Sequence, residues 1–593
     1  MEMIERKDQK TQDTWDLSAL TVSQEAWDKD MAAVRARFGE LDEYKGKLGE
    51  SSDSLYSALK KLFEILQEAE RLLSWAFLMY SADSSNPEVM NRAGIADMAE
   101  SEFSEKTSWM DPELMSISDE KIEEWLKEER FQPYTVYIRK ARRMKDHVLS
   151  DKEERIMSLY GANAEGYHQA FMDIDNIDLD FGEVRGEKLT HSTWTKFIHS
   201  TDESVREEAY KAFYKTYEKN QHIIARLYEG SVKNDIFSSK ARGYNSSLER
   251  ALFPDNVPEE VYTNLISSVH SAFPSLHRYY ALRAKLLGKD KLKHWDVYVP
   301  MVPAVGAKHT YEEAVDIIRE AVKPLGEDYS NILCSGLTTE RWVDRYENKG
   351  KRSGAFSAGC FTGNPYILTN FEDDVINSVF TLIHEGGHSM HSYFSARNNP
   401  FPSYNYTIFE AEVASTFNEN LLARYLLDHS ESKEEKAFII AQQLDNIVAT
   451  FFRQTMFAEF ELLVHQEAES GRPINVTFFR KTYRQLLENY FGPQLEFEEN
   501  SDMEGLRIPH FYRAFYVYKY ATGIAASIAL SQRVLKGGDK ERDDYLSFLK
   551  SGGSRYPIDA LKVAGVDMSK SDAVKATAAY FDSLITELEN LIS

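Results

Sequence analysis

Cysteine is nearly absent from the sequence, since only Cys334 and Cys360 occur among 593 residues. Two cysteines cannot build a disulfide framework, so the chain is predicted to fold through its hydrophobic core in a reducing compartment. Basic residues are also scarce: 70 Lys and Arg stand against 95 Asp and Glu, a formal net charge of −25. This balance argues against a nucleic acid or an anionic membrane surface as a partner.

Long hydrophobic runs are missing as well. The most apolar stretch, ATGIAASIAL at residues 521–530, is too short to cross a bilayer and predicts a buried core helix. The first residues, MEMIERKDQKTQ, are charged and lack the apolar region of a signal peptide. The expected location is therefore the cytoplasm, with no membrane partner.

Proline is infrequent, at 16 residues, and falls mostly in short connections. Between these connections, apolar residues recur at spacings of three and four over long segments, which predicts a mainly α-helical protein. Two stretches break this pattern. Residues 173–191 predict a small β-hairpin, and residues 354–371 mix glycine with β-forming residues.

A buried helix is predicted over residues 375–394, which contain His384-Glu-Gly-Gly-His388. Residues four apart on a helix lie one turn above each other, so the imidazoles of His384 and His388 can bind one metal ion. Glu385 can reach a metal-bound water and act as its general base. His391 continues the stripe, but His384 to His391 spans about 10 Å of helix axis, too far for one ion.

The third ligand must therefore come from another segment, because a catalytic zinc has three protein ligands and an open position for water. The sequence FEAEVASTFNE at residues 409–419 also reads as a helix. Glu412 is the candidate ligand in it, 24 residues after His388, with room for a loop and a returning helix. Glu410 and Glu419 either support a ligand histidine or are solvated helix charges, and the spacing leaves both possibilities open.

HEGGHSMH and FEAEVASTFNE resemble the oligoendopeptidase F branch of the thimet oligopeptidase family of zinc metallopeptidases. Other motifs agree over nearly the full length: TWDLSAL, FPDNVPEEVY, LHRYYALRAKLLG, IPHFYRAFYVYKYATG and SGGSRYPIDALKVAGVDM. The resemblance implies a mainly α, two-lobed helical fold with a deep central channel and a small β element near the zinc site. We expect residues 1–200 to form an N-terminal helical lobe and residues 201–593 the zinc-metallopeptidase catalytic domain.

The resemblance also implies roles for individual residues. His384, His388 and Glu412 correspond to the ligands of one zinc ion per chain, and Glu385 to the general base. In the segment 510–520, His510 and Tyr518 are expected to stabilise the transition state and Tyr512 to contact substrate; spacing leaves the choice between Tyr512, Tyr516 and Tyr518 open. Residues 354–368 are expected to supply an edge strand along which a peptide pairs by its backbone.

The predicted function is hydrolysis of internal bonds in short, unfolded oligopeptides by a zinc-bound water that Glu385 activates. A non-catalytic peptide-binding protein on the same fold is an alternative, although a degenerate relative would be expected to have lost Glu385 or a ligand. A zinc carboxypeptidase is a nearer alternative, which would need a charged pocket for the substrate terminus that the sequence does not locate.

Overall fold

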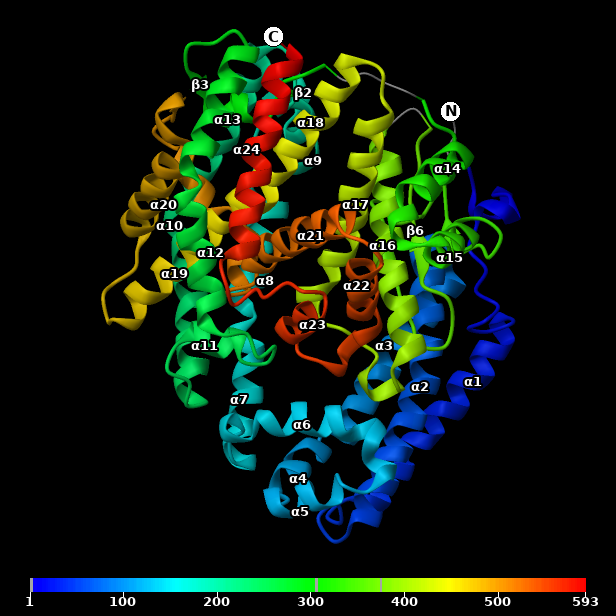
Figure 1. The fold of residues 1–593 in the computed structure, drawn as a ribbon. Coiled ribbons are helices and arrows are strands. Elements are labelled where there is room, and N and C mark those ends of the chain that lie inside the picture. The colour runs from blue at the N-terminus through cyan, green and yellow to red at the C-terminus, as the bar shows by residue number, and fades with distance from the viewer. Residues whose placement is uncertain (1–3, 304–307, 374–375, 593) are drawn as a thin grey trace. The chain divides into compact units, whose positions relative to one another are not determined.

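The computed structural model describes residues 4–303, 308–373 and 376–592. Helices make up most of the described chain, and its strands are only two or three residues long (Figure 1). The predicted mainly α fold is therefore confirmed. The predicted core helix at residues 521–530 is confirmed too, because it lies buried inside α21.

Two compact units divide the chain, and each joins segments that are distant in sequence. Unit 1 comprises residues 1–146, 306–428 and 530–566, and unit 2 comprises residues 147–305, 429–529 and 567–593. The predicted division into a lobe of residues 1–200 and a catalytic domain of residues 201–593 stays a prediction. The internal contacts group the chain differently, because residues 306–428 pack with the N-terminal helices.

The helices of unit 1 are α1 (Gln24–Arg37), α2 (Ser52–Ala82), α3 (Pro87–Thr107), α4 (Met110–Ser116), α5 (Asp119–Trp125), α6 (Thr135–Arg143), α14 (Tyr311–Ala321), α15 (Glu327–Leu337), α16 (Ile376–Asn398), α17 (Ile408–His429), α22 (Asp539–Ser551) and α23 (Pro557–Val563). The α-helices of unit 2 are α7 (Asp151–Ala164), α8 (Gly166–Asp173), α9 (His191–Ile198), α10 (Glu203–Ala241), α11 (Ser247–Leu252), α12 (Glu259–Ser271), α13 (Phe273–Leu286), α18 (Lys433–Ile447), α19 (Arg453–Glu469), α20 (Val476–Phe491) and α24 (Asp572–Ile592). Helix α21 (Tyr518–Lys536) begins in unit 2, and its residues from 530 on belong to unit 1.

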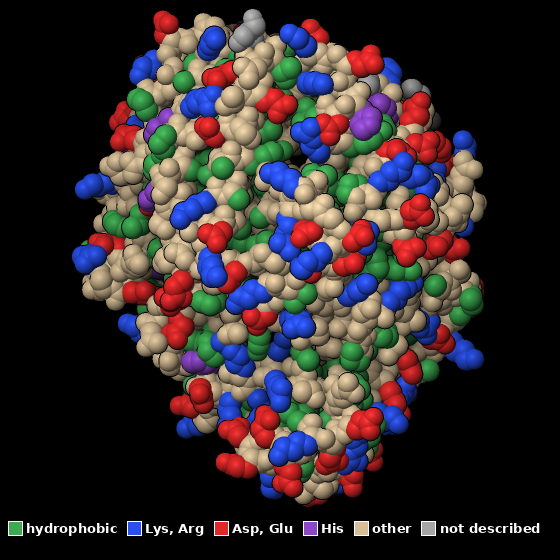
Figure 2. Space-filling view, in the orientation of Figure 1, with side chains coloured by type: hydrophobic (Ala, Val, Ile, Leu, Met, Phe, Trp, Pro, Cys, Tyr) green, Lys and Arg blue, Asp and Glu red, His purple; other side chains and the backbone are tan. Residues whose placement is uncertain are grey.

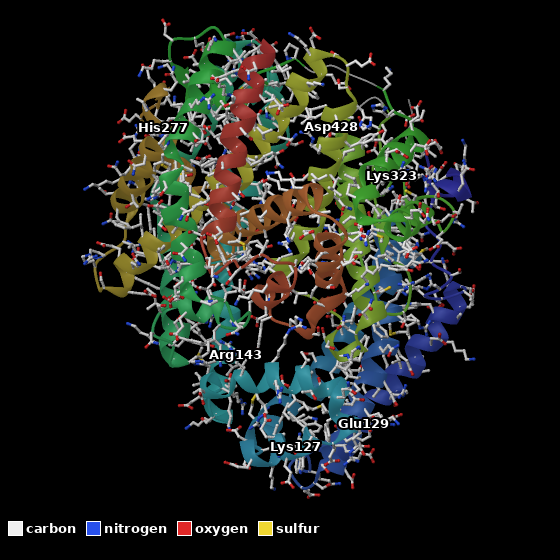
Figure 3. The ribbon with its side chains drawn as sticks, viewed as in Figure 1. Lys127, Glu129, Arg143, His277, Lys323 and Asp428 are labelled. Atoms are coloured by element: carbon white, nitrogen blue, oxygen red, sulfur yellow. The ribbon has the colours of Figure 1, made fainter. Side chains whose placement is uncertain are left out.

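Helix α2 organises the N-terminal part of unit 1. The Ser51 side chain caps its first turn, and apolar residues at helical spacing bury one face against α1 and α3. Trp27 of α1 is fully buried there and donates its indole N–H to the carbonyl of Leu72, 2.9 Å away. Lys127 and Glu129, after α5, are exposed at the surface of this unit (Figure 3).

A three-stranded sheet in unit 1 has the order β4 (Val343–Asp344), β6 (Tyr366–Leu368), β5 (Phe356–Ala358). Strand β6 pairs in parallel with β4 and antiparallel with β5. Because β6 is its only partner among the described strands, β5 is an edge strand. The edge strand predicted within residues 354–368 is therefore present.

Unit 2 has two small pairings, an antiparallel one of β1 (Glu183–Val184) with β2 (Glu187–Lys188) and a parallel one of β3 (Leu292–Lys293) with β7 (Leu495–Glu496). The first is the predicted hairpin, turned by Arg185 and Gly186 at positive φ. The prediction of extended chain from residue 173 was wrong, because residues 174–178 form a π-helical turn.

The described chain holds no helix long and apolar enough to cross a membrane. Both cysteines are buried and carry free thiols. On the face drawn in Figure 2, acidic and basic side chains are interspersed over much of the surface.

Candidate active site

Helix α16 carries the HEGGH motif, and its geometry places the two histidines together. His384 and His388 are one turn apart, and their ring centroids lie 4.9 Å from each other. The side chains keep 25% and 17% of their surface exposed, so both rings are partly accessible. Val375, predicted as the first residue of this helix, lies outside the described residues.

Close packing of α17 against α16 brings the third donor to the histidines. A Cβ atom on Gly387 would lie 2.5 Å from the carbonyl oxygen of Ala414, so only glycine allows this approach. Glu412, on the adjacent turn of α17, places its Oε2 3.7 Å from His384 Nε2 and 3.9 Å from His388 Nε2. One ligand atom from each of the three residues lies within 4.8 Å of the others.

Glu419 holds the remaining nitrogen of the first histidine. Its Oε1 lies 2.5 Å from His384 Nδ1, which leaves Nε2 directed toward Glu412. The backbone of Ala411 makes a hydrogen bond to the ring of His388. Such contacts fix the orientation of metal-binding imidazoles. Of the two readings that the sequence left open for Glu419, the structure supports contact with a histidine.

Glu410 and His391, the other candidates near the motif, make different contacts. Glu410 Oε2 accepts hydrogen bonds from the backbone N–H and the hydroxyl of Thr407, both at 3.1 Å, at the start of α17. His391 is buried and stacks on Tyr406 with a centroid distance of 3.6 Å, and burial lowers its pKa to about 3. Neither belongs to the group of three convergent donors.

The electrostatics of the site indicate an excess of negative charge. Burial by itself lowers the pKa of His384, but the hydrogen bond and charge of Glu419, with Glu385 and Glu412, raise it to about 9. Burial raises the pKa of Glu385 to about 7, and the neighbouring carboxylates add to this effect. Carboxylates therefore outnumber the imidazoles at this site, and they favour a positive charge beside His384. Two imidazole nitrogens and one carboxylate oxygen form a ligand set that zinc prefers, so the residues fit a zinc ion.

Edge strand β5 lies directly against the motif helix. The hydroxyls of Ser357 and Ser389 lie 2.8 Å apart, and Ser389 directly follows His388. The backbone of Ser357 also makes a hydrogen bond to Glu385, which lowers the pKa of that carboxyl and opposes the effect of burial. The edge strand and the three donors therefore belong to one site within unit 1.

The predicted C-terminal residues lie in unit 2, where their exposure differs sharply. His510 is exposed. The Tyr512 hydroxyl is buried, and its ring stacks on Phe171 at 4.6 Å. Tyr518 is 0% exposed and packs against Tyr262 at 5.2 Å. Such burial is typical of a core aromatic residue and counts against Tyr518 as a hydrogen-bond donor to the transition state.

Two other tyrosines lie beside His510. The ring centroids of Tyr516 and Tyr520 are 6.2 and 6.0 Å from that of His510, and both side chains are partly exposed. Tyr520 was not singled out from the sequence, although its spacing of four from Tyr516 is a helical signal. Phe515, just before them, has a positive φ of 57°, and its N–H donates to the buried Glu461 Oε1 at 2.9 Å. This strained turn fixes the direction of the following tyrosines.

A helical fold with two histidines and a following glutamate on one helix, and a second glutamate from the next, defines a metallopeptidase. Comparison with protein families identifies the metallopeptidase family to which the chain belongs. Residues 196–580 match peptidase family M3, and residues 113–181 match oligopeptidase F. The chain belongs to peptidase family M3, in its oligoendopeptidase F branch, and is a metalloendopeptidase.

Two relatives match this chain in sequence over nearly its full length. An oligoendopeptidase F homolog of Borreliella burgdorferi is 40% identical over 99% of this chain and 100% of its own. Oligopeptidase PepF of Bacillus subtilis is 40% identical over 100% of this chain and 89% of its own.

Solved structures are similar too. The crystal structure of oligoendopeptidase-F from Enterococcus faecium has a TM-score of 0.74 and 31% identity, over 95% of this chain and 98% of that one. A chain from Chlamydophila abortus has a TM-score of 0.93 and 36% identity, with both chains covered completely.

Proposed function

We propose that this metalloendopeptidase uses one zinc ion, held by His384, His388 and Glu412, to hydrolyse internal bonds of short, unfolded peptides. The observation that carries the proposal is the convergence of these three donors within 4.8 Å. Glu385, adjacent to the first donor, supplies the base that hydrolysis requires. When bound, zinc lowers the pKa of a coordinated water and polarises a carbonyl group.

Residues of the chain transfer the proton of the attacking water and hold the reacting side chains in place. Glu385 is mostly buried beside the donors, so its carboxylate can accept the proton of the attacking water and pass it to the leaving amine. The hydrogen bond from Ser357 holds that carboxylate in position. Glu419 holds the His384 ring so that Nε2 remains available as a ligand.

The edge of β5 that pairs with no described strand is proposed to bind the substrate; the residues of this strand are partly exposed. A peptide that adds as a further strand gains backbone hydrogen bonds whatever its sequence, which suits an enzyme acting on many peptides. The names of the relatives, oligopeptidase and oligoendopeptidase, support short peptides as the substrate class.

His510 and one tyrosine of the segment 510–520 are proposed to donate hydrogen bonds to the developing oxyanion. Partial exposure favours Tyr516 over the buried Tyr518 for this role, and the stacked ring of Tyr512 favours a structural contribution.

Two measurements test the proposal. Mass spectrometry of products from peptides of graded length should show internal cleavage, and elemental analysis should show about one zinc per chain. Glu385→Gln should retain the zinc and lose turnover by several orders of magnitude, whereas Glu412→Ala should lose the zinc itself.

Other results would contradict the proposal. Stepwise loss of single C-terminal residues would support a carboxypeptidase. Peptide binding without hydrolysis by the zinc-loaded protein would support a non-catalytic binding protein. Equal zinc contents in the Glu385→Gln and Glu412→Ala variants would refute the assignment of roles.

A further inference from the structure

Large aromatic side chains are exposed beside the edge strand. Phe77 and Tyr80, on helix α2, expose 42% and 41% of their surface, whereas most large apolar side chains of this helix are at least partly buried. Phe356, the first residue of β5, lies next to Phe77 with a centroid distance of 5.3 Å. Phe356 is only partly buried, so the two rings form one exposed apolar surface at the edge of the sheet.

Hydrogen bonds fix helix α2 along this strand on both sides of the aromatic pair. Before the strand, the N–H of Arg352 donates to the carbonyl of Ser81 at 2.9 Å. After the strand, the N–H of Phe361 donates to the Glu70 carboxylate at 3.0 Å. The strand and the helix therefore run antiparallel over this stretch, and the position of Phe77 relative to β5 is fixed.

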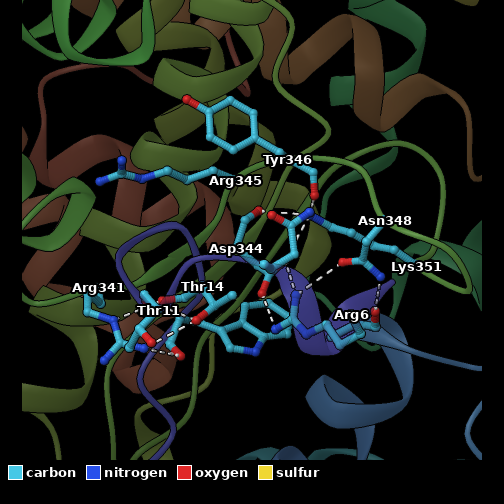
Figure 4. A network of polar contacts seen from close by, with 12 residues as sticks. Arg6, Thr11, Thr14, Arg341, Asp344, Arg345, Tyr346, Asn348 and Lys351 are labelled. Atoms are coloured by element: carbon cyan, nitrogen blue, oxygen red, sulfur yellow. Dashed lines mark hydrogen bonds and ion pairs between the residues drawn. The ribbon is translucent and has the colours of Figure 1, made fainter. Parts of the chain in front are cut away.

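A buried ionic network stabilises the segment that leads into β5 (Figure 4). Asp344, on β4, pairs with Arg6 and with Lys351, whose side chains are 22% and 0% exposed. Asn348 joins the network through Arg6 and donates to the carbonyl of Ala82 at the end of α2, 3.0 Å away. The aromatic surface thus has a rigid base, as a site that discriminates between side chains requires.

Strand geometry determines what this surface can contact. Successive side chains of a strand point to opposite faces of the sheet. The Ser357 side chain faces α16 and Ser389, whereas Phe356 and Ala358 pack on the hydrophobic core that contains α2. A peptide added at the edge of β5 would therefore direct every second side chain toward Phe77 and Phe356, and the others toward the helix with the metal ligands.

We propose that Phe77 and Phe356, with Tyr80 beside them, form a subsite that selects large apolar side chains at alternate positions of the substrate. The guanidinium of Arg352 lies 5.6 Å from the ring centroid of Phe356, so Phe77 offers the more open apolar surface. The inference rests on the proposed binding of peptides along β5, and it names the residues that decide which peptides bind well.

The test uses the zinc-loaded enzyme and synthetic peptides in which one Leu or Phe is moved stepwise through an alanine-rich sequence with a fixed cleavage site. The wild type should prefer the large residue at positions two apart, with kcat/KM about tenfold above the alanine peptide. Phe77→Ala should remove this preference, so that the ratio of kcat/KM on the Leu or Phe peptide to that on the alanine peptide falls to about one. Phe77→Leu should keep much of it, because the side chain stays apolar.

Phe237→Ala is the matched control. Phe237 is also an exposed phenylalanine, at 44%, and packs against another ring, Tyr160, at 4.9 Å. It lies on α10 and belongs to unit 2, whereas β5 belongs to unit 1, so its loss should leave the preference unchanged. Should Phe77→Ala fold poorly, as judged by its Tm, Phe356→Ser must remove the same preference in a folded protein.

Three results would overturn the inference. They are a preference without the two-residue period, an equal loss of kcat/KM on all peptides in the Phe77 variants, and the same loss of preference in Phe237→Ala. The proposed function would survive each of these, since peptides would still be cut. Absence of hydrolysis for every peptide by the zinc-loaded wild type would instead refute the proposed function.

Discussion

Removing the Glu419 carboxylate should weaken metal binding although Glu419 is not a ligand. Its Oε1 lies 2.5 Å from His384 Nδ1, and the contact raises the pKa of that imidazole. A charge-assisted hydrogen bond of this kind contributes about 1.5–3 kcal/mol. Because 1.4 kcal/mol corresponds to a factor of ten, Glu419→Ala should raise the Kd for zinc about 10- to 100-fold.

Glu419→Gln should have an intermediate effect. The amide oxygen can still accept from Nδ1, but as a neutral partner, so about 1 kcal/mol or fivefold in Kd should be lost. Competition with a chromophoric chelator at fixed pH measures these values directly. Under saturating zinc, much of the lost activity should return, because the ligands and Glu385 are intact.

The control for this experiment is a second histidine–glutamate pair in unit 2. Glu459 Oε2 lies 2.7 Å from His270 Nε2, so Glu459→Ala removes the same type of contact. It should leave the Kd for zinc within about twofold of the wild type. A wild-type Kd in Glu419→Ala, or an equal rise in Glu459→Ala, would refute the role assigned to Glu419.

Three further predictions concern the metal, the tyrosine segment and pH. A chelator should abolish hydrolysis and leave far-UV circular dichroism largely unchanged, because the helices that carry the ligands are packed in a large core; loss of helix would indicate a structural metal. Tyr516→Phe should lower kcat about 10²-fold, whereas Tyr518→Phe should leave kcat near normal, since the Tyr518 side chain is fully buried; the reverse pattern in steady-state kinetics would return the role to Tyr518. Burial raises the pKa of Glu461 well above its usual 4.5. The folded chain therefore retains a proton that the unfolded chain releases, and the free energy of unfolding falls as pH rises above about 4.5. Glu461→Gln removes the titrating carboxyl but keeps an acceptor for the Phe515 N–H. The Tm of this variant should therefore exceed that of the wild type by more at pH 8 than at pH 5. A difference in Tm that does not depend on pH, measured by calorimetry, would contradict this.

Local sequence pattern was enough to predict the helical class and to place two of the three proposed metal ligands together. A spacing of four on a helix places His384 and His388 on one face whatever surrounds them, because backbone geometry alone fixes that relation. The edge strand could also be located approximately, since glycine and β-forming residues interrupt the helical pattern there. Motif spacing also made Glu412 the candidate for the third ligand. Family resemblance supported that choice and added the segment 510–520.

Tertiary packing decided what each remaining residue does. Gly387 permits α17 to approach α16, and that approach places Glu412 beside the two histidines and Glu419 against His384. Glu410 instead contacts Thr407, three residues away at the start of α17. The sequence singles out Glu412 by its distance from His388, but it leaves the roles of Glu410 and Glu419 open, because all three lie on one predicted helix.

The roles of the aromatic residues likewise depend on packing that the sequence does not reveal. Composition marks residues 510–520 as aromatic, but burial separates Tyr518 from Tyr516, and a strained turn at Phe515 sets their directions. Likewise, the sequence gives no reason to associate Phe77 with Phe356, which lie 279 positions apart and meet only through the pairing of α2 with an edge strand. The sequence by itself determined periodicity, motif and family, because these depend on neighbours along the chain. Which side chains meet, and which are buried, was decided only by the packing of helices whose contacts span hundreds of residues.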